Sequence, residues 1–240
     1  MALPYALSPA PAASLGLIVL EADETLENEA RRALPDDVSL HHTRIPSAPE
    51  VTPETLAAMK AELPRVAASF PGHVKYDVIG YGCTSGATVI GQDAVASAIQ
   101  SVHSGVLTTD PISAVMAACD ALGARRIGLL TPYEPPVSAA MRDLLEAKGY
   151  QIASFASFEQ KEEATVARID EASTLGGMLE VGEKAEVVFA SCTNVRTFNV
   201  IEEAERQLGK PVISSNSALI WRMARLARAE AAIPGRLSSA

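Results

Sequence analysis

The sequence lacks three features that would each point to a different class of protein. It has no apolar run of about 18 residues, which a membrane-spanning helix needs. Its net charge of −9 leaves no basic stripe for nucleic acid. Its three cysteines are an odd number, so a 240-residue chain gains no disulfide framework from them. We therefore predict a cytoplasmic protein without a membrane or nucleic-acid partner.

Recognisable metal and phosphate sites are also missing. None of the four histidines has metal-ligand spacing with Cys, Asp or Glu, and His41 and His42 belong to the alternating, strand-like run SLHHTRIP. The segment GCTSG at residues 82–86 lacks the lysine and the glycine spacing of a phosphate loop. The opening MALPYALSPAPAASLG has no basic n-region, so we expect a loose N-terminal arm there. We predict chemistry without a metal or an organic cofactor.

The sequence does contain a regular alternation of short apolar runs with helical patterns. Helix starts are marked by Thr52 before Pro53 and by Asp110 before Pro111. Fully apolar runs are typical of strands that are buried on both faces. The alternation predicts an α/β fold with parallel strands flanked by helices. The predicted strands are 15–20, 77–82, 105–109, 127–131, 186–191 and 211–215.

Three strand-and-loop units recur in the second half of the chain at a nearly constant offset. The matched positions, with offsets of 112, 109 and 106 residues, are Gly16 with Gly128, Cys83 with Cys192, and Val106 with Val212. We interpret the recurrence as two similar lobes, each with a parallel sheet, related by a pseudo-two-fold axis. The predicted lobes are residues 1–110 together with 216–240, which form a C-terminal helix, and residues 111–215.

Cys83 and Cys192 each follow an apolar strand and precede small polar residues. Ligands bind beyond the carboxyl ends of parallel strands, so we expect the two thiols to face each other across one cleft between the lobes. The neighbouring amides would lower the pKa of the thiols and bind a carboxylate. Cys119 has no such context and is predicted to be a core residue. The residues predicted to bind the carboxylate are Thr84, Ser85, Thr193 and Asn194.

Two thiols beside a carboxylate suit chemistry at the neighbouring carbon. One thiolate can remove a proton or add to a double bond, while the opposite thiol supplies a proton from the other face. The amides would stabilise negative charge that spreads onto the carboxylate during the reaction.

These cysteine loops, the duplicated lobes and the segment TPY ending in Tyr133 resemble the aspartate/glutamate racemase superfamily. Within it, the chain is most similar to the branch that contains maleate cis–trans isomerases and arylmalonate decarboxylases. The segments TRIP (43–46) and CTSGATVIG (83–91) look closest to a member encoded with ectoine-utilisation enzymes. The resemblance implies cofactor-independent catalysis by Cys83 and Cys192, with Tyr133 contacting a substrate carboxylate.

Three positions depart from patterns within this superfamily. The decarboxylases have Gly at the first cysteine position, so Cys83 argues against decarboxylation. The amino-acid racemases usually have His after the second Cys-Thr, where this chain has Asn194. In the first loop, an Asn-rich turn is replaced by EADETLENE. Its Asp23 and Glu24 would repel a dicarboxylate if they pointed inward, whereas Thr25 could still donate a hydrogen bond to one.

The leading hypothesis is an isomerase of a small carboxylate, with maleate-to-fumarate conversion as the model reaction. The alternatives are a racemase of an α-substituted carboxylate, a decarboxylase and a protein that binds a carboxylate without turning it over. We also expect a homo-oligomer.

Overall fold

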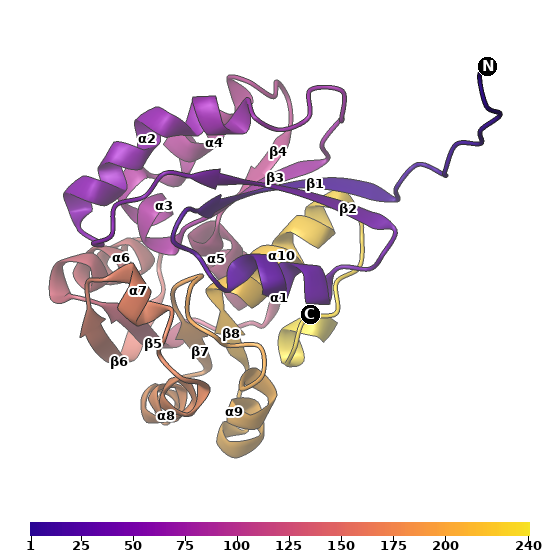
Figure 1. Ribbon diagram of the computed structural model, residues 1–240. Coiled ribbons are helices and arrows are strands. Elements are labelled where there is room, and N and C mark those ends of the chain that lie inside the picture. The colour runs from indigo at the N-terminus through magenta and orange to yellow at the C-terminus, as the bar shows by residue number, and fades with distance from the viewer.

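The computed structural model describes residues 1–240 and contains two four-stranded sheets, both wholly parallel. The strand order is β2-β1-β3-β4 in the first sheet and β6-β5-β7-β8 in the second, so the second sheet repeats the first (Figure 1). This repetition confirms the predicted α/β fold of two similar lobes. The strands are β1 (Ala13–Leu20), β2 (Val38–Ile45), β3 (Val78–Gly82), β4 (Leu107–Thr109), β5 (Arg126–Tyr133), β6 (Gln151–Gln160), β7 (Val187–Ala190) and β8 (Val212–Ser214).

Helices connect the strands and flank both sheets (Figure 1). Several of them begin at side-chain caps, and two of these, Thr52 and Asp110, were marked by the sequence. Thr52 forms a capping box at α2, Asp110 caps α5, and Ser214 forms a capping box at α10. No helix combines the length and the apolar character needed to cross a membrane. The helices are α1 (Leu26–Ala33), α2 (Pro53–Ala67), α3 (Thr84–Ile90), α4 (Gln92–Gln100), α5 (Pro111–Ala121), α6 (Pro135–Ala147), α7 (Glu163–Val166), α8 (Glu171–Gly182), α9 (Ile201–Leu208), α10 (Ser215–Ala227) and the 3-10 helix η1 (Arg236–Ser239).

The strand registers support the duplication at the level of single residues. Gly16 in β1 lies opposite Ile79 in β3, and Gly128 in β5 lies opposite Val188 in β7. Ile79 and Val188 are therefore equivalent, and they are 109 residues apart. This is the offset that separates the two matched cysteines, so both thiols follow equivalent strands.

The third pairing in the predicted repeat is wrong by two residues. Ile79 lies opposite Thr108, and Val188 lies opposite Val212, so the partner of Val212 is Thr108 rather than Val106. The strands concerned, β4 and β8, have only three residues each. Such short strands carry too little periodicity to define a register from the sequence.

Edge strands account for the other differences from the predicted pattern. The segment 105–109 is not a strand buried on both faces, because β4 lies at the edge of its sheet and Leu107 is 49% exposed. Strand β6 also lies at an edge, is only partly buried and was not predicted, since it lacks an apolar run. Strand β2 coincides with the alternating run around His41.

One apolar core extends through both lobes. It contains Leu17 and Ile79 from the first sheet and Leu129 and Phe189 from the second, all essentially inaccessible to solvent. A second, smaller cluster lies between the second sheet and the helices α8 and α9. Because apolar burial is shared across the lobes, it holds the two sheets together as well as stabilising each one.

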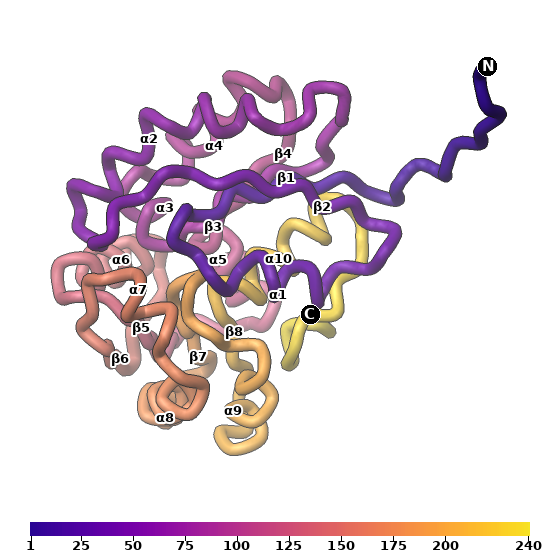
Figure 2. Tube along the Cα trace, viewed as in Figure 1, coloured from indigo at the N-terminus to yellow at the C-terminus, as the bar shows by residue number.

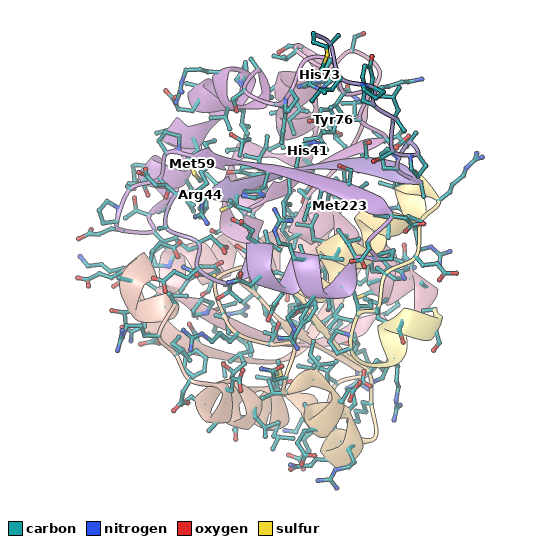
Figure 3. The ribbon with its side chains drawn as sticks, turned by 45° about the vertical axis from the view of Figure 1, so that its right-hand side comes forward. His41, Arg44, Met59, His73, Tyr76 and Met223 are labelled. Carbon is teal, nitrogen blue, oxygen red and sulfur yellow. The ribbon has the colours of Figure 1, made fainter.

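The C-terminal helix α10 packs against the first sheet rather than only against the lobe that precedes it in the chain. A Cβ atom at Gly80 of β3 would lie 2.5 Å from the Sδ atom of Met223 in α10 (Figure 3), so glycine permits this close packing. Figure 2 shows the chain returning to the first lobe at its C-terminal end, while the N-terminal arm leads away from the body.

Candidate active site

Cys83 lies where β3 ends and α3 begins, and it is the N-cap residue of that helix. Its Sγ atom accepts a hydrogen bond from the Gly86 N–H at 3.2 Å and lies 3.7 Å from Ser85 Oγ. A Cβ atom at Gly86 would come within 2.8 Å of this sulfur and 2.5 Å of Tyr81 Oη. Glycine at this position therefore leaves room for the thiol and directs an amide at it.

Cys192 lies after β7, but its backbone differs from that of Cys83. Its φ is 94°, a region that residues other than glycine rarely adopt, whereas φ is −147° at Cys83. The Cys192 N–H donates to Ser215 Oγ at 3.0 Å, and the Asn194 N–H donates to Cys192 Sγ at 3.4 Å. A residue of α10 thus supports the strained backbone, and the two matched cysteines are not equivalent.

Both cysteines lie close to the same two side chains. Tyr133, at the end of β5, is buried, and its pKa is raised by that burial and by the neighbouring Cys192 and Cys83. Glu163, at the start of α7, acts electrostatically on both thiols. The structure therefore brings together thiols that are 109 residues apart, with Tyr133 and Glu163 beside them.

The predicted lowering of the thiol pKa values is wrong for this structure. Cys83 and Cys192 are only 2% and 4% exposed. Burial raises the pKa of Cys83 to about 12 and that of Cys192 well above its usual range. The amide hydrogen bonds favour the thiolates, but they offset only part of the cost of removing a charge from water. Both cysteines therefore rest as neutral thiols.

The third cysteine, Cys119, does not belong to this site. Cys119 is wholly buried on α5 and belongs to the main apolar core, as predicted. Burial raises the pKa of its thiol to about 12.

The hydroxyl groups next to the two cysteines connect the lobes to each other. Thr84 Oγ1 lies 2.7 Å from Ser215 Oγ, which also accepts the amide of Cys192. Thr193 Oγ1 donates to the carbonyl oxygen of Gly82 at 3.3 Å. Thr84 and Thr193 were predicted to bind the substrate carboxylate through their amides, and their side chains form contacts that hold the two cysteine loops together.

The side chain of Asn194 is likewise engaged in hydrogen bonds within the protein. Its Oδ1 atom accepts from the Glu24 N–H at 2.8 Å, and its Nδ2 atom donates to the Ala22 carbonyl and to Glu163 Oε2, both at 3.1 Å. Thr25 Oγ1 donates to the Asn194 carbonyl at 3.0 Å instead of facing a ligand. A substrate-binding role for these residues would depend on their backbone amides.

The first loop places one of its two acidic residues inside the protein. Asp23 is 3% exposed, and its Oδ1 atom accepts from the amides of Thr25 and Leu26 at 2.9 and 2.8 Å. Its Oδ2 atom is buried without a hydrogen-bond partner. Burial raises the pKa of this carboxyl group. Glu24, in contrast, is exposed. Of the two acids that raised doubt about a dicarboxylate, only Asp23 points inward.

Glu163 was not predicted as a site residue. The amide of Val51 donates to the Lys161 carbonyl at 2.8 Å, and the Glu163 amide donates to the Pro49 carbonyl at 3.0 Å. These contacts between the lobes bury Glu163, which is 4% exposed, and burial raises the pKa of its carboxyl group. In the sequence, Glu163 belongs to a short acidic run with no periodicity, so nothing there marks it as buried.

A surface cavity of about 490 Å³ opens beside Glu163. It lies where the segment after β2 meets the segment before α7, so both lobes line it. Half of its eight lining residues are glutamates, namely Glu21, Glu50, Glu162 and Glu163. The cavity that Glu163 lines is therefore acidic, and neither cysteine is among its lining residues.

Comparison with known proteins places the chain among enzymes with the same architecture. It is 28% identical over 234 residues to maleate isomerase of Nocardia farcinica, and the match covers 92% of each chain. It is 27% identical over 238 residues to maleate isomerase of Pseudomonas putida, and the match covers 92% of this chain and 94% of that one. The fold also matches a solved structure of the N. farcinica maleate cis–trans isomerase, with a TM-score of 0.83 and 27% identity over 94% of this chain and 98% of that one. That structure is of a cysteine-to-serine mutant with a covalently bound succinylcysteine intermediate. The family model for arylmalonate decarboxylase matches residues 88–238. These findings confirm the resemblance to the maleate isomerase and arylmalonate decarboxylase branch, and the chain belongs to the arylmalonate decarboxylase family.

Proposed function

We propose that this protein is a cofactor-independent isomerase that converts a small cis-alkenoic carboxylate into its trans isomer. The observation that carries the proposal is that the loops of Cys83 and Cys192, one from each lobe, meet through the Thr84–Ser215 and Thr193–Gly82 hydrogen bonds. Tyr133 and Glu163 lie beside the two thiols. The curated relatives named maleate isomerases, which align over 92% of this chain, support the same class of reaction.

In the proposed reaction, the Cys83 sulfur adds to one alkene carbon and the Cys192 thiol protonates the other. A C–S bond forms, the π electron pair becomes the new C–H bond, and the proton released by Cys83 restores the Cys192 thiol. The carbon–carbon bond is now single and rotates. Cys192 then removes the proton again, the double bond re-forms, and the C–S bond breaks as Cys83 recovers its proton. The succinylcysteine described for the N. farcinica relative is an adduct of this kind.

Both sulfurs are neutral at rest, so the proposal couples thiolate formation to substrate binding. The amides of Gly86 and Asn194 already point at the sulfurs and stabilise charge as it develops there. Tyr133 lies beside Cys192, where its hydroxyl group would donate to the substrate carboxylate. Burial keeps this hydroxyl group protonated and able to donate, because it raises the pKa of Tyr133 well above its usual value.

A racemase of an α-substituted carboxylate is the second candidate. It is favoured by the approach of one thiol from each lobe, which is the arrangement that two-base proton exchange needs. The unequal backbones of the two cysteines favour the isomerase, in which their roles differ.

Proton NMR in deuterated water tests the proposal with the wild-type protein and with Cys83→Ser and Cys192→Ser. New alkene signals would report isomerisation, and loss of an α-proton signal would report racemisation. We expect Cys83→Ser to lose nearly all isomerisation, because a serine hydroxyl is scarcely ionised at neutral pH. Cys192→Ser should retain a small activity if water partly replaces its proton. Cys119→Ser serves as the matched control and should retain activity. Full activity in Cys83→Ser would refute both enzymatic candidates.

A further inference from the structure

The charges around the two thiols do not suit a substrate with two carboxylates. The charged groups that act most strongly on the sulfurs are the carboxyls of Glu163, which affects both, and of Asp23, which affects Cys192. The cavity beside Glu163 adds three further glutamates at its rim. A dianion entering here would meet carboxyl groups inside the site and at its mouth.

The nearest cationic side chains are committed to other partners. Arg44 (Figure 3) donates to the carbonyl oxygens of Leu20, Glu21 and Asp23 and forms an ion pair with Glu27 at 3.1 Å. Lys161, next in sequence to the cavity-lining Glu162, pairs with Glu50 at 3.2 Å on the surface. Arg44 already interacts with Asp23 and Glu27, and Lys161 with Glu50, so neither cation is free to pair with a second carboxylate.

Asp23 instead offers an unused hydrogen-bond acceptor. Its Oδ2 atom is buried and accepts no hydrogen bond, although a buried polar atom is normally satisfied. The Thr193 hydroxyl interacts with this carboxyl group but donates to the Gly82 carbonyl instead. Glu163 accepts one hydrogen bond, from Asn194, which leaves further acceptor positions on its two oxygens. Acceptors without donors are complementary to a ligand that carries N–H groups.

We propose that the substrate carries one carboxylate and, at its other end, a nitrogen-bearing group, which is either a carboxamide, giving a monoanion, or an ammonium, giving a zwitterion. This inference rests on the proposed isomerase function and narrows its substrate class. The carboxylate lies near Tyr133 and the amides after the cysteines, and the N–H donors bind Asp23 and Glu163. These two residues thereby determine specificity against dicarboxylates.

Three cis-alkenoic acids test the substrate class by turnover. Maleamate carries a carboxamide, cis-4-aminobut-2-enoate carries an ammonium, and maleate carries a second carboxylate. We expect kcat/KM for at least one nitrogen-bearing compound to exceed that for maleate by about tenfold or more, because a site whose buried polar groups are left unpaired rejects the analogue by at least this factor. Which of the two nitrogen compounds is preferred distinguishes carboxamide from ammonium. Equal or better turnover of maleate would overturn the inference while leaving the isomerase in place.

Charge-neutral variants test the two specificity residues. Asp23→Asn retains the oxygen that accepts from Thr25 and Leu26, and Glu163→Gln retains an oxygen for Asn194. Each variant should shift the preference toward maleate by about tenfold, mainly through KM. Glu24→Gln, next to Asp23 but exposed, is the matched control and should leave the preference unchanged. An unchanged preference in both site variants would contradict the assignment.

The binding of saturated analogues, which cannot be isomerised, tests the substrate class independently of the isomerase activity. Calorimetry should show that succinamate or 4-aminobutyrate binds more tightly than succinate, and that Asp23→Asn reverses this order. If no alkene is isomerised but this order holds, the substrate class stands and the isomerase proposal fails. If succinate binds as tightly as both nitrogen compounds, the substrate class is refuted whatever the turnover.

Discussion

Glu29 connects the first lobe to the loop that carries Cys192, and its titration should control the stability of the protein. It lies on α1 and is 5% exposed. Its Oε1 atom accepts from the amides of Thr197 and Phe198 at 3.2 and 3.1 Å, and its Oε2 atom accepts from Asn216 Nδ2 at 2.6 Å. Burial, which outweighs these hydrogen bonds, raises the pKa of Glu29 from 4.5 to about 7.

These two pKa values determine how the stability changes with pH. Between pH 4.5 and 7 the folded state binds more protons than the unfolded chain, so raising the pH destabilises the fold. The favourable contribution is fully present below pH 4.5 and is lost as the pH rises through about 7. For this one group, the free energy of unfolding should fall by about 2–3 kcal/mol between pH 5 and pH 8.

Urea unfolding at pH 5 and pH 8 measures this difference in the wild-type protein and in Glu29→Gln. Other buried carboxyls with raised pKa values, such as Asp110, add to the pH dependence of both proteins, so the comparison isolates Glu29. We expect the glutamine variant to lose about 2–3 kcal/mol less than the wild type over this range. Glu202→Gln, on the exposed face of α9, should behave as the wild type. An equal loss in Glu29→Gln and wild type would refute the reasoning.

Three further predictions concern the site itself. Gly86→Ala should destabilise the protein by about 1–3 kcal/mol in urea unfolding and lower turnover, because its Cβ atom would lie 2.5 Å from Tyr81 Oη and 2.8 Å from Cys83 Sγ; unchanged values would contradict this packing. Tyr133→Phe should raise KM for the carboxylate substrate by an amount equivalent to about 1–3 kcal/mol, as steady-state kinetics would show, whereas an unchanged KM would exclude the hydroxyl as a donor. All three cysteines should react with iodoacetamide much more slowly in the native protein than in urea, since each is buried with a raised pKa; fast native labelling of any of them would show an accessible thiolate.

Several features of the protein were determined by local patterns in the sequence. Most of the buried strands have continuous apolar runs, and the helices α2 and α5 have clear N-cap signals, so their positions were predictable. The matched setting of Cys83 and Cys192 depends only on each residue and its neighbours. Together with the other recurring strand units and the segment ending in Tyr133, it predicted two similar lobes and the family. Strand β6 was missed because an edge strand needs no continuous apolar run.

The tertiary structure alone decided the chemical state and the surroundings of the two thiols. The local setting suggested activated cysteines, but burial by the opposite lobe raises their pKa values, and desolvation depends on residues far away in the chain. Glu163 became a site residue only because residues 49–51 of the first lobe pair with residues 161–163 of the second. Asn194 became a link between the lobes for the same reason. Sequence patterns report which residues are apolar or polar, whereas the partner that each polar group meets is determined by contacts between segments more than 100 residues apart.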